Sequence, residues 1–217
     1  MEIQMKEQLK SRVGLYGGTF SPPHLGHLHA ACEFVEKLSL DRLVIMPVNI
    51  PPHKQAEHLV DGKRRIELCR IAFGSIAKAE ISDYEISKDG VSYTVDTLRH
   101  MSNENTELYM LCGDDMFLTL DTWRRACEIF SLTSVVCMRR YLTDGEPLLI
   151  KKAEYEEKYG ARVYFIDAAA YPVSSTEIRE RLKNGESCDG LLDTEVEKYI
   201  RENGIYLRDK GSIKSES

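Results

Sequence analysis

Apolar positions along the chain alternate between short continuous runs and longer stretches with helical spacing. Short runs closed by turn residues predict buried strands, whereas apolar residues three or four positions apart predict helices packed on one side. Strands that alternate with helices are typical of a parallel sheet. The pattern predicts an α/β fold, a Rossmann-like open parallel sheet with helices on both faces and a small C-terminal helical portion. The expected strands are 13–16, 42–48, 79–86, 108–112, 134–138 and 162–166, and the expected helices are 28–38, 62–76, 92–101, 147–159, 174–184 and 194–203, with further helical segments around Trp123.

One domain is expected to account for most of the 217 residues. We expect residues 1–11 to form an N-terminal extension and residues 12–207 to form a single domain, whose C-terminal helical portion begins at about residue 174. Residues 208–217 are polar and are expected to form a flexible tail.

The charge balance disfavours a long nucleic acid as the main partner. The chain has 29 Lys and Arg against 35 Asp and Glu, a net charge of −6, so no broad basic face is expected. A small polyanion held by a few cations stays compatible with this balance. No apolar run approaches the ~20 residues of a membrane helix, and residues 1–12 lack an apolar signal core. We therefore expect a cytoplasmic protein without a membrane partner.

A glycine-rich segment connects the first predicted strand to the first predicted helix. It reads Gly17-Gly18-Thr19-Phe20-Ser21-Pro22-Pro23-His24-Leu25-Gly26-His27. Glycines let a backbone approach phosphate oxygens, and a helix start adds oriented N–H groups. The two histidines can donate to the same phosphate chain, so the segment predicts a polyphosphate site. The alternative is a helix-capping histidine followed by a surface histidine; a zinc site is disfavoured because no third ligand lies at suitable spacing.

A second anion site is predicted near the C-terminus, at Val173-Ser174-Ser175-Thr176-Glu177-Ile178-Arg179. Three hydroxyls and unpaired N–H groups at a helix start, with an arginine one turn further along, suit an anion. Ser174 and Glu177 also have the spacing of a capping box, so the segment alone is compatible with a simple helix start.

The first segment resembles the H-x-G-H hallmark of the nucleotidylyltransferase superfamily, which class I aminoacyl-tRNA synthetases share in variant form. The resemblance implies that His24 and His27 stabilise the phosphates of ATP during attack on the α-phosphorus. Relatives usually carry Asp at the position of Ser21, so no role is carried over to that side chain. The further ATP contacts implied by this segment are Gly17, Gly18, Thr19 and Phe20.

The second segment is similar to the S-S-T-x-I-R hallmark of the adenylyltransferase branch of that superfamily. The resemblance implies that this segment holds the β- and γ-phosphates of ATP. Its residues in this role are Ser174, Ser175, Thr176 and Arg179.

Segments in the middle of the chain indicate the acceptor. Pro51-Pro52-His53-Lys54 follows the second strand, Ser92-Tyr93-Thr94 follows a glycine turn, Gly113-Asp114-Asp115 ends the fourth strand, and Trp123 is the single tryptophan. Each alone fits a loop, a helix start, a turn or a core aromatic residue. Together they resemble the bacterial nicotinate-mononucleotide adenylyltransferase family, and the resemblance runs from Val13 to about Leu207.

That resemblance implies roles for the matching positions. Trp123 would stack on the pyridine ring of the acceptor, beside the backbone of Arg124. Relatives often have Arg-Pro-Gly where this chain has Arg139-Arg140-Tyr141, so Arg139 is carried over as an ATP contact but the following loop is expected to differ. The remaining implied positions are Lys54, Tyr93 and Thr94 in the acceptor pocket, and Gly113 and Asp115 at the nucleotide ribose.

No metal-binding residues are predicted. Six dispersed cysteines without a C-x-x-C pair are expected as buried thiols rather than disulfides or zinc ligands. Asp114-Asp115 could be taken for a metal site, but no further carboxylate stands at matching spacing. The resemblance implies Mg²⁺ as the cofactor, held mainly through the ATP phosphates and water, as its octahedral shell prefers.

The resemblance implies transfer of the adenylyl group of ATP to nicotinate mononucleotide, with His24, His27, Lys54 and Arg179 as catalytic residues. Alternatives within enzymes are nicotinamide mononucleotide or phosphopantetheine as acceptor; phosphopantetheine offers no ring for Trp123 to stack on. An aminoacyl-tRNA synthetase fragment would need a lysine loop and a basic face that are not visible here. A nucleotide-binding regulator without turnover is the alternative outside enzymes. The oligomeric state is not determined, and a homo-oligomer stays open.

Overall fold

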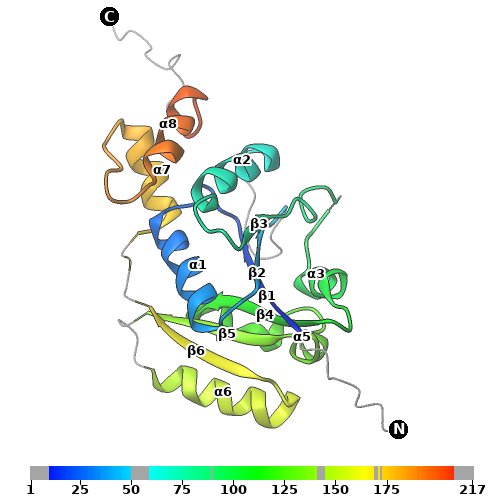
Figure 1. Cartoon of the computed structure of the whole chain (residues 1–217). Helices are drawn as coiled ribbons and strands as arrows, with labels where there is room; N and C mark the ends of the chain where they lie inside the picture. Colours follow the sequence, from blue (N-terminus) through cyan, green and yellow to red (C-terminus); the bar gives the residue numbers. More distant parts are fainter. Residues whose placement is uncertain are drawn as a thin grey trace, which may run out of the picture.

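The computed structural model describes residues 10–49, 59–88, 90–140, 145–168, 171 and 173–207. Its centre is a six-stranded sheet in the order β3-β2-β1-β4-β5-β6, and every neighbouring pair is parallel (Figure 1). The strands are β1 (Ser11–Gly18), β2 (Arg42–Pro47), β3 (Ala79–Ile81), β4 (Thr106–Gly113), β5 (Ser134–Arg140) and β6 (Val163–Ala168). The helices are α1 (Leu25–Lys37), α2 (Gly62–Phe73), α3 (Thr94–Met101), α4 (Asp114–Phe117), α5 (Ala126–Leu132), α6 (Glu146–Tyr159), α7 (Ser175–Asn184) and α8 (Thr194–Glu202), with the 3₁₀ helix η1 (Leu120–Thr122).

The strand order reverses direction between β1 and β4. From β1 the chain builds outward through β2 and β3, and it then crosses to the other side of β1 to add β4, β5 and β6. In β1, Leu15 lies between Val44 of β2 and Met110 of β4. Open α/β sheets bind ligands in the crevice at such a reversal, outside the carboxyl ends of the strands. The glycine-rich segment leaves β1 and the Gly113 turn leaves β4 at this edge.

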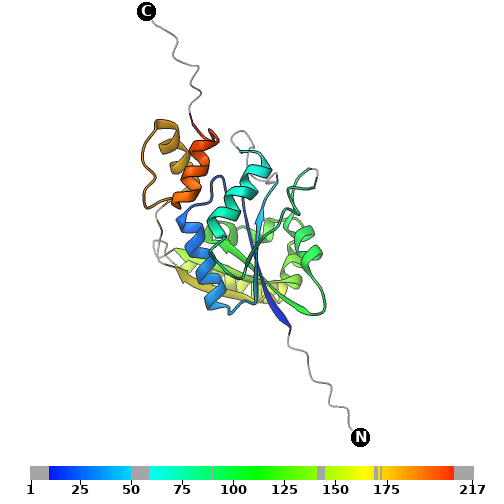
Figure 2. The ribbon, with the colours of Figure 1, turned by 45° about the horizontal axis from the view of Figure 1, so that its top comes forward.

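Helices cover both faces of the sheet, as the sequence predicts. One core contains buried residues of α1, α2, α7 and α8, and the other contains those of α3, α4, α5 and α6. Successive residues of a strand point to opposite faces of the sheet. In β2, Leu43 and Ile45 are therefore part of the first core, whereas Val44 and Met46 are part of the second core. Figure 2 shows α7 and α8 beside α1 and α2, so the C-terminal helices extend the first layer.

The third strand is shorter than the prediction of 79–86. Only Ala79–Ile81 pairs with β2, and the chain then turns, with the N–H of Ser87 donating to the carbonyl of Asp83 at 2.8 Å. The turn buries Glu85, whose carboxylate accepts a hydrogen bond from Thr97 of α3 at 2.6 Å. Polar and apolar residues are interspersed in this segment, and Tyr84 and Ile86 continue its apolar positions, so the sequence pattern does not distinguish this turn from a half-buried strand.

All six cysteines are free thiols, as predicted, but the expected burial is wrong for two of them. Four are buried, while Cys32 and Cys127 are exposed. No helix in the described part of the chain is long and apolar enough to cross a membrane. The predicted N-terminal extension lies outside the described residues except for Lys10 and Ser11, and the tail 208–217 lies wholly outside them.

Candidate active site

The two histidines of the first motif stack on each other at the start of α1. Their ring centroids are 3.6 Å apart and the rings are tilted by 30°. The N–H of His27 donates to Nδ1 of His24 at 3.3 Å, and the N–H of His24 donates to Nδ1 of His27 at 3.2 Å. His24 is the N-cap of α1, so the pair forms a capping box made of two imidazoles.

This capping arrangement determines which ring nitrogens carry protons. A neutral imidazole has one donor and one acceptor nitrogen. Because each Nδ1 accepts a hydrogen bond from a backbone N–H, the proton of each neutral ring is on Nε2. Both rings can therefore present an Nε2–H donor, so the capping reading and the phosphate-binding reading of the motif are compatible.

Gly26 allows this geometry because it has no side chain. A Cβ at this position would lie 3.1 Å from ring atoms of His24 and 3.2 Å from Val173, which is tighter than nine in ten such contacts in proteins. Gly18 has a similar constraint, because a Cβ there would lie 2.8 Å from the ring of Phe20. A side chain at Gly18 would force a shift, and one at Gly26 would require its neighbours to move by a few tenths of an ångström.

The side chain of Phe20 is buried and packs against the ring of His27. It is 1% exposed and lies edge-on to His27, with ring centroids 5.2 Å apart, and to Tyr16 at 5.4 Å. Its φ of 47° is in the left-handed region, which is costly for a bulky residue. A ligand contact at Phe20 would therefore come from its backbone rather than its ring.

The second motif packs directly against the first. Arg179 donates from Nη1 to the carbonyl of Ser21 at 2.8 Å, and the hydroxyl of Ser175 donates to the carbonyl of Pro22 at 2.9 Å. Arg179 also donates from Nη2 to the hydroxyl of Thr176 at 3.0 Å. The two segments predicted as anion sites therefore form one surface, although more than half of the chain separates them.

Ser174 has the capping role that its spacing with Glu177 allows. It is the N-cap of α7, and its hydroxyl oxygen accepts from the N–H of Glu177 at 3.1 Å. The Glu177 carboxylate pairs with Arg181 at 3.0 Å. The serine hydroxyl oxygen is thus engaged in capping, and its O–H remains a donor.

A residue that sequence reasoning missed reaches the first motif from the C-terminal end. The hydroxyl of Tyr206 lies 2.8 Å from that of Ser21. Burial raises the pKa of Tyr206 to about 12, although the hydrogen bond with Ser21 acts in the opposite direction. No local pattern around Tyr206 indicated this contact. The buried arginine Arg65 of α2 was also missed, although it is in helical register with the apolar positions Cys69 and Phe73.

Two of the residues predicted for the acceptor pocket, Arg124 and Trp123, lie on the same side of the sheet as Tyr93. The guanidinium of Arg124 lies over the Tyr93 ring, 4.3 Å from its centroid. Trp123 is half-buried and packs against the same core as Tyr93. Thr94 is the first residue of α3. Lys54, also assigned to this pocket, lies outside the described residues.

At the carboxyl ends of β4 and β5, the predicted ATP contacts have other partners. Gly113 ends β4, and a Cβ there would lie 3.1 Å from Oδ1 of Asp115. Asp115 is exposed, whereas Asp114 is buried. Arg139 donates from Nε to Asp167 of β6 at 2.6 Å, so an ATP contact would compete with this ion pair. Tyr141, in the loop expected to differ, lies outside the described residues.

The described residues contain no group of three or more His, Cys, Asp or Glu side chains that could hold a metal ion. The site instead consists of N–H, imidazole, hydroxyl and guanidinium donors. This donor set suits phosphate oxygens, which accept hydrogen bonds.

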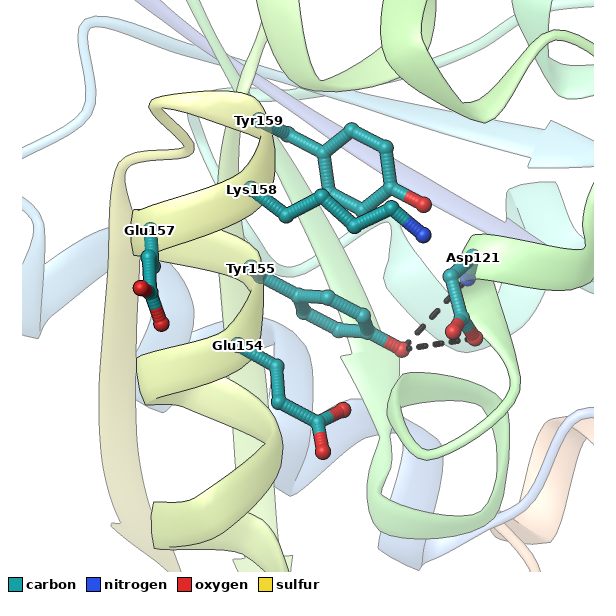
Figure 3. A pocket seen from close by; sticks show the side chains of 6 residues that line it. All are labelled: Asp121, Glu154, Tyr155, Glu157, Lys158 and Tyr159. Carbon is teal, nitrogen blue, oxygen red and sulfur yellow. Dashed lines mark hydrogen bonds between the residues drawn. The ribbon is translucent and has the colours of Figure 1, made fainter.

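A separate cavity of about 260 Å³ lies between α6 and η1 (Figure 3). The hydroxyl of Tyr155 donates to the carbonyl of Phe117 at 2.7 Å and points toward Asp121, whose carboxylate oxygen lies 3.3 Å from the hydroxyl oxygen. Lys151 pairs with Asp121 at 2.9 Å. Among the predicted site residues that the structure describes, none lines this cavity, whose lining is Asp121, Glu154, Tyr155, Glu157, Lys158 and Tyr159.

Comparisons with known proteins identify the family of the chain. The family model described as cytidylyltransferase-like matches residues 15–181. A probable nicotinate-nucleotide adenylyltransferase of Clostridium botulinum is 37% identical over 195 residues, which cover 90% of this chain and 98% of that protein. A protein of the same description from Desulfatibacillum aliphaticivorans is 37% identical over 218 residues, covering 90% of this chain and 100% of the relative.

The fold is also similar to solved structures. Nicotinic acid mononucleotide adenylyltransferase of Plasmodium falciparum, complexed with NaAD, superposes with a TM-score of 0.74 at 17% identity, covering 90% of this chain and 97% of that one. At this identity the likeness concerns the fold alone. It agrees with the Rossmann-like architecture predicted from the sequence.

Proposed function

Because the chain belongs to the nicotinate-nucleotide adenylyltransferase family, we propose that it transfers the adenylyl group of ATP to nicotinate mononucleotide. The products are deamido-NAD and pyrophosphate, and the reaction is a step of NAD biosynthesis. The observation that carries the proposal is the joining of the two anion-binding motifs, in which Arg179 and Ser175 bond to the carbonyls of Ser21 and Pro22. Donors from both ends of the chain can then surround one triphosphate.

The reaction needs positioning and charge stabilisation more than a protein nucleophile. The 5′-phosphate of the acceptor is already anionic at neutral pH and attacks the α-phosphorus in line. The Nε2–H groups of His24 and His27 stabilise the negative charge that develops on the α-phosphate and the leaving pyrophosphate. Lys54 helps to neutralise the phosphates where they meet. The leaving pyrophosphate is held by Ser174, Ser175, Thr176 and Arg179, and Ser175 acts through its backbone N–H at the start of α7 because its hydroxyl donates to the carbonyl of Pro22.

The nucleotide and the acceptor ring bind on either side of these groups. The backbone of Gly17, Gly18, Thr19 and Phe20 contacts the ATP phosphates, while Gly113, Asp115 and Arg139 contact the rest of the nucleotide. Trp123 stacks on the pyridine ring, and its neighbours Tyr93, Thr94 and Arg124 complete the pocket. N–H donors favour a nicotinate carboxylate, which only accepts hydrogen bonds, over an amide that presents its own NH₂ group.

Mg²⁺ is the proposed cofactor and arrives bound to the ATP phosphates. When bound, it neutralises phosphate charge and orients the leaving group. The donor-rich site supplies no carboxylate cluster for the ion among the described residues, which suits a cation held by phosphate oxygens and water.

Pyrophosphate release measured with three acceptors tests the proposal. We expect turnover with nicotinate mononucleotide, weaker turnover with nicotinamide mononucleotide and none with phosphopantetheine. Preference for either of the other acceptors would overturn the substrate assignment. Binding of ATP in a calorimeter without pyrophosphate release from any acceptor would indicate a nucleotide-binding regulator instead.

A further inference from the structure

A buried arginine that the reaction does not use directly lies beneath the glycine-rich loop. Arg65 is on the second turn of α2 and is 2% exposed. In the described part of the chain, no carboxylate forms an ion pair with its guanidinium. A buried charge without a paired carboxylate is costly unless its donors are satisfied by other polar groups.

Backbone carbonyls satisfy this guanidinium. Its Nε donates to Val60 at 2.9 Å, Nη1 donates to Val48 at 2.7 Å and to Thr19 at 3.0 Å, and Nη2 donates to Asn49 at 3.4 Å. These carbonyls belong to three segments: the glycine-rich loop, the end of β2 and the approach to α2. The rigid fork of an arginine can serve several directions at once, which the single ammonium of a lysine cannot reproduce.

These bonds orient two consecutive peptide groups of the glycine-rich loop. The N–H of Val48 donates to the carbonyl of Gly18 at 2.9 Å, and Arg65 binds the next carbonyl, that of Thr19. In a planar trans peptide the C=O and the following N–H point in opposite directions. With both carbonyls directed at β2 and Arg65, the N–H groups of Thr19 and Phe20 point the other way.

We propose that Arg65 is a positioning residue that aims the N–H groups of Thr19 and Phe20 at the phosphates of ATP. The inference rests on the proposed function for the identity of the anion. Arg65 acts through the backbone and does not touch the nucleotide. Its positive charge also lies behind the loop, where it favours a bound polyanion.

The test compares Arg65→Lys and Arg65→Met with Arg70→Lys in the full-length chain. Arg70 is on the same helix, is exposed and pairs with Glu67, so its variant controls for changes in α2. Affinity for ATP is measured by calorimetry, and kcat and both KM values are measured by pyrophosphate release. All assays are run well below the lowest unfolding temperature of the set.

We expect Arg65→Lys to weaken ATP binding and to lower kcat/KM for ATP by about tenfold or more, because small misplacements of binding groups are costly. The KM for the acceptor should stay within about twofold of wild type, and Arg70→Lys should match wild type. A purely structural role would lower the unfolding temperature without this split between substrates, and that result would overturn the proposal. An Arg65→Lys variant that binds ATP as tightly as wild type would also overturn the proposal. A positive charge would then suffice without the several directed bonds of the guanidinium group.

The outcome is separable from the proposed function. If the wild-type chain releases no pyrophosphate with any acceptor, the proposed reaction fails, yet the ratio of ATP affinities between Arg65→Lys and wild type still tests Arg65. If Arg65→Met does not fold, Arg65→Lys carries the comparison alone, because it keeps the charge and most of the side-chain volume.

Discussion

The hydroxyl of Ser21 and the hydroxyl of Tyr206 lie 2.8 Å apart, although 185 positions separate them in the chain. This bond joins the loop of the first motif to the segment that follows α8. Arg179 binds the carbonyl of the same serine, so Ser21 is held from two sides by the C-terminal portion. The side chain of Ser21 therefore forms a neutral hydroxyl pair with Tyr206.

Tyr206→Phe should lower the free energy of unfolding by about 1 kcal/mol, the usual net value of one hydrogen bond. Burial raises the pKa of Tyr206 to about 12. The stabilisation of the folded chain by the neutral Tyr206 hydroxyl should therefore be complete below the ordinary tyrosine pKa of about 10, and it should be lost as pH rises through the folded-state pKa. Denaturant titrations at neutral and alkaline pH measure this, with Tyr199→Phe in α8 as the control. Equal stability of Tyr206→Phe and wild type at neutral pH would contradict the role of the bond.

His27→Ala should lower turnover by roughly a hundredfold or more, the usual effect of removing one electrostatic stabiliser of the transition state. His100→Ala is the matched control. His100 is an exposed residue of α3, and its ring stacks on that of Tyr84 with ring centroids 3.8 Å apart. Steady-state pyrophosphate release and circular dichroism are measured on both variants. A folded His27→Ala enzyme with near-normal turnover would remove the histidines from the mechanism.

Gly26→Ala should reduce kcat by about tenfold while the protein stays folded, because the new Cβ displaces the His24 ring from its place and misorients Nε2. Gly145→Ala serves as the control, since a Cβ there meets no atom within 4 Å. Turnover and thermal unfolding are compared for the two variants. If both alanine variants keep full activity, the close approach of Gly26 to His24 has no catalytic consequence.

Trp123→Leu should raise the KM for the acceptor and leave the KM for ATP unchanged. Stacking of a flat ring contributes ~0.5–1.5 kcal/mol beyond area burial, which corresponds to roughly a two- to tenfold increase in KM. Initial rates with each substrate varied in turn measure the two constants. An equal rise in both would place Trp123 in the core rather than in the acceptor pocket.

Glu85→Gln should change how stability depends on pH. Burial raises the pKa of Glu85, partly offset by hydrogen bonds from Thr97 and Ser92. Stability from the protonated carboxyl is complete below the unfolded pKa of about 4.3 and is lost as pH rises through the folded pKa. Glutamine keeps an oxygen for Thr97 and does not ionise, so wild type should lose stability relative to Glu85→Gln over that interval.

Denaturant titrations from acid to neutral pH check this prediction. The exposed Glu180→Gln is the control and should follow wild type at every pH. A constant difference between Glu85→Gln and wild type would show that Glu85 ionises normally in the folded chain.

The local pattern of the chain determined most of the elements and identified the two motifs that we propose to bind phosphates. Apolar periodicity, turn residues and capping residues act over a few positions, so the strands 42–48 and 134–138 and the helix 174–184 could be predicted closely. The capping spacing of Ser174 and Glu177 was equally readable. The prediction was wrong beyond residue 81, where the chain turns and buries Glu85 instead of extending the edge strand.

Only the tertiary structure decided how the two motifs meet. The strand order places the first motif at the reversal between β1 and β4, and the bonds from Arg179, Ser175 and Tyr206 to the first motif cross more than 150 positions. Arg65 shows the same limit, because an arginine on a helix face has no sequence signal for the carbonyls that it binds. Local interactions specify helices and strands, whereas the partners of a buried polar group depend on which distant backbone the packed sheet brings within hydrogen-bond reach.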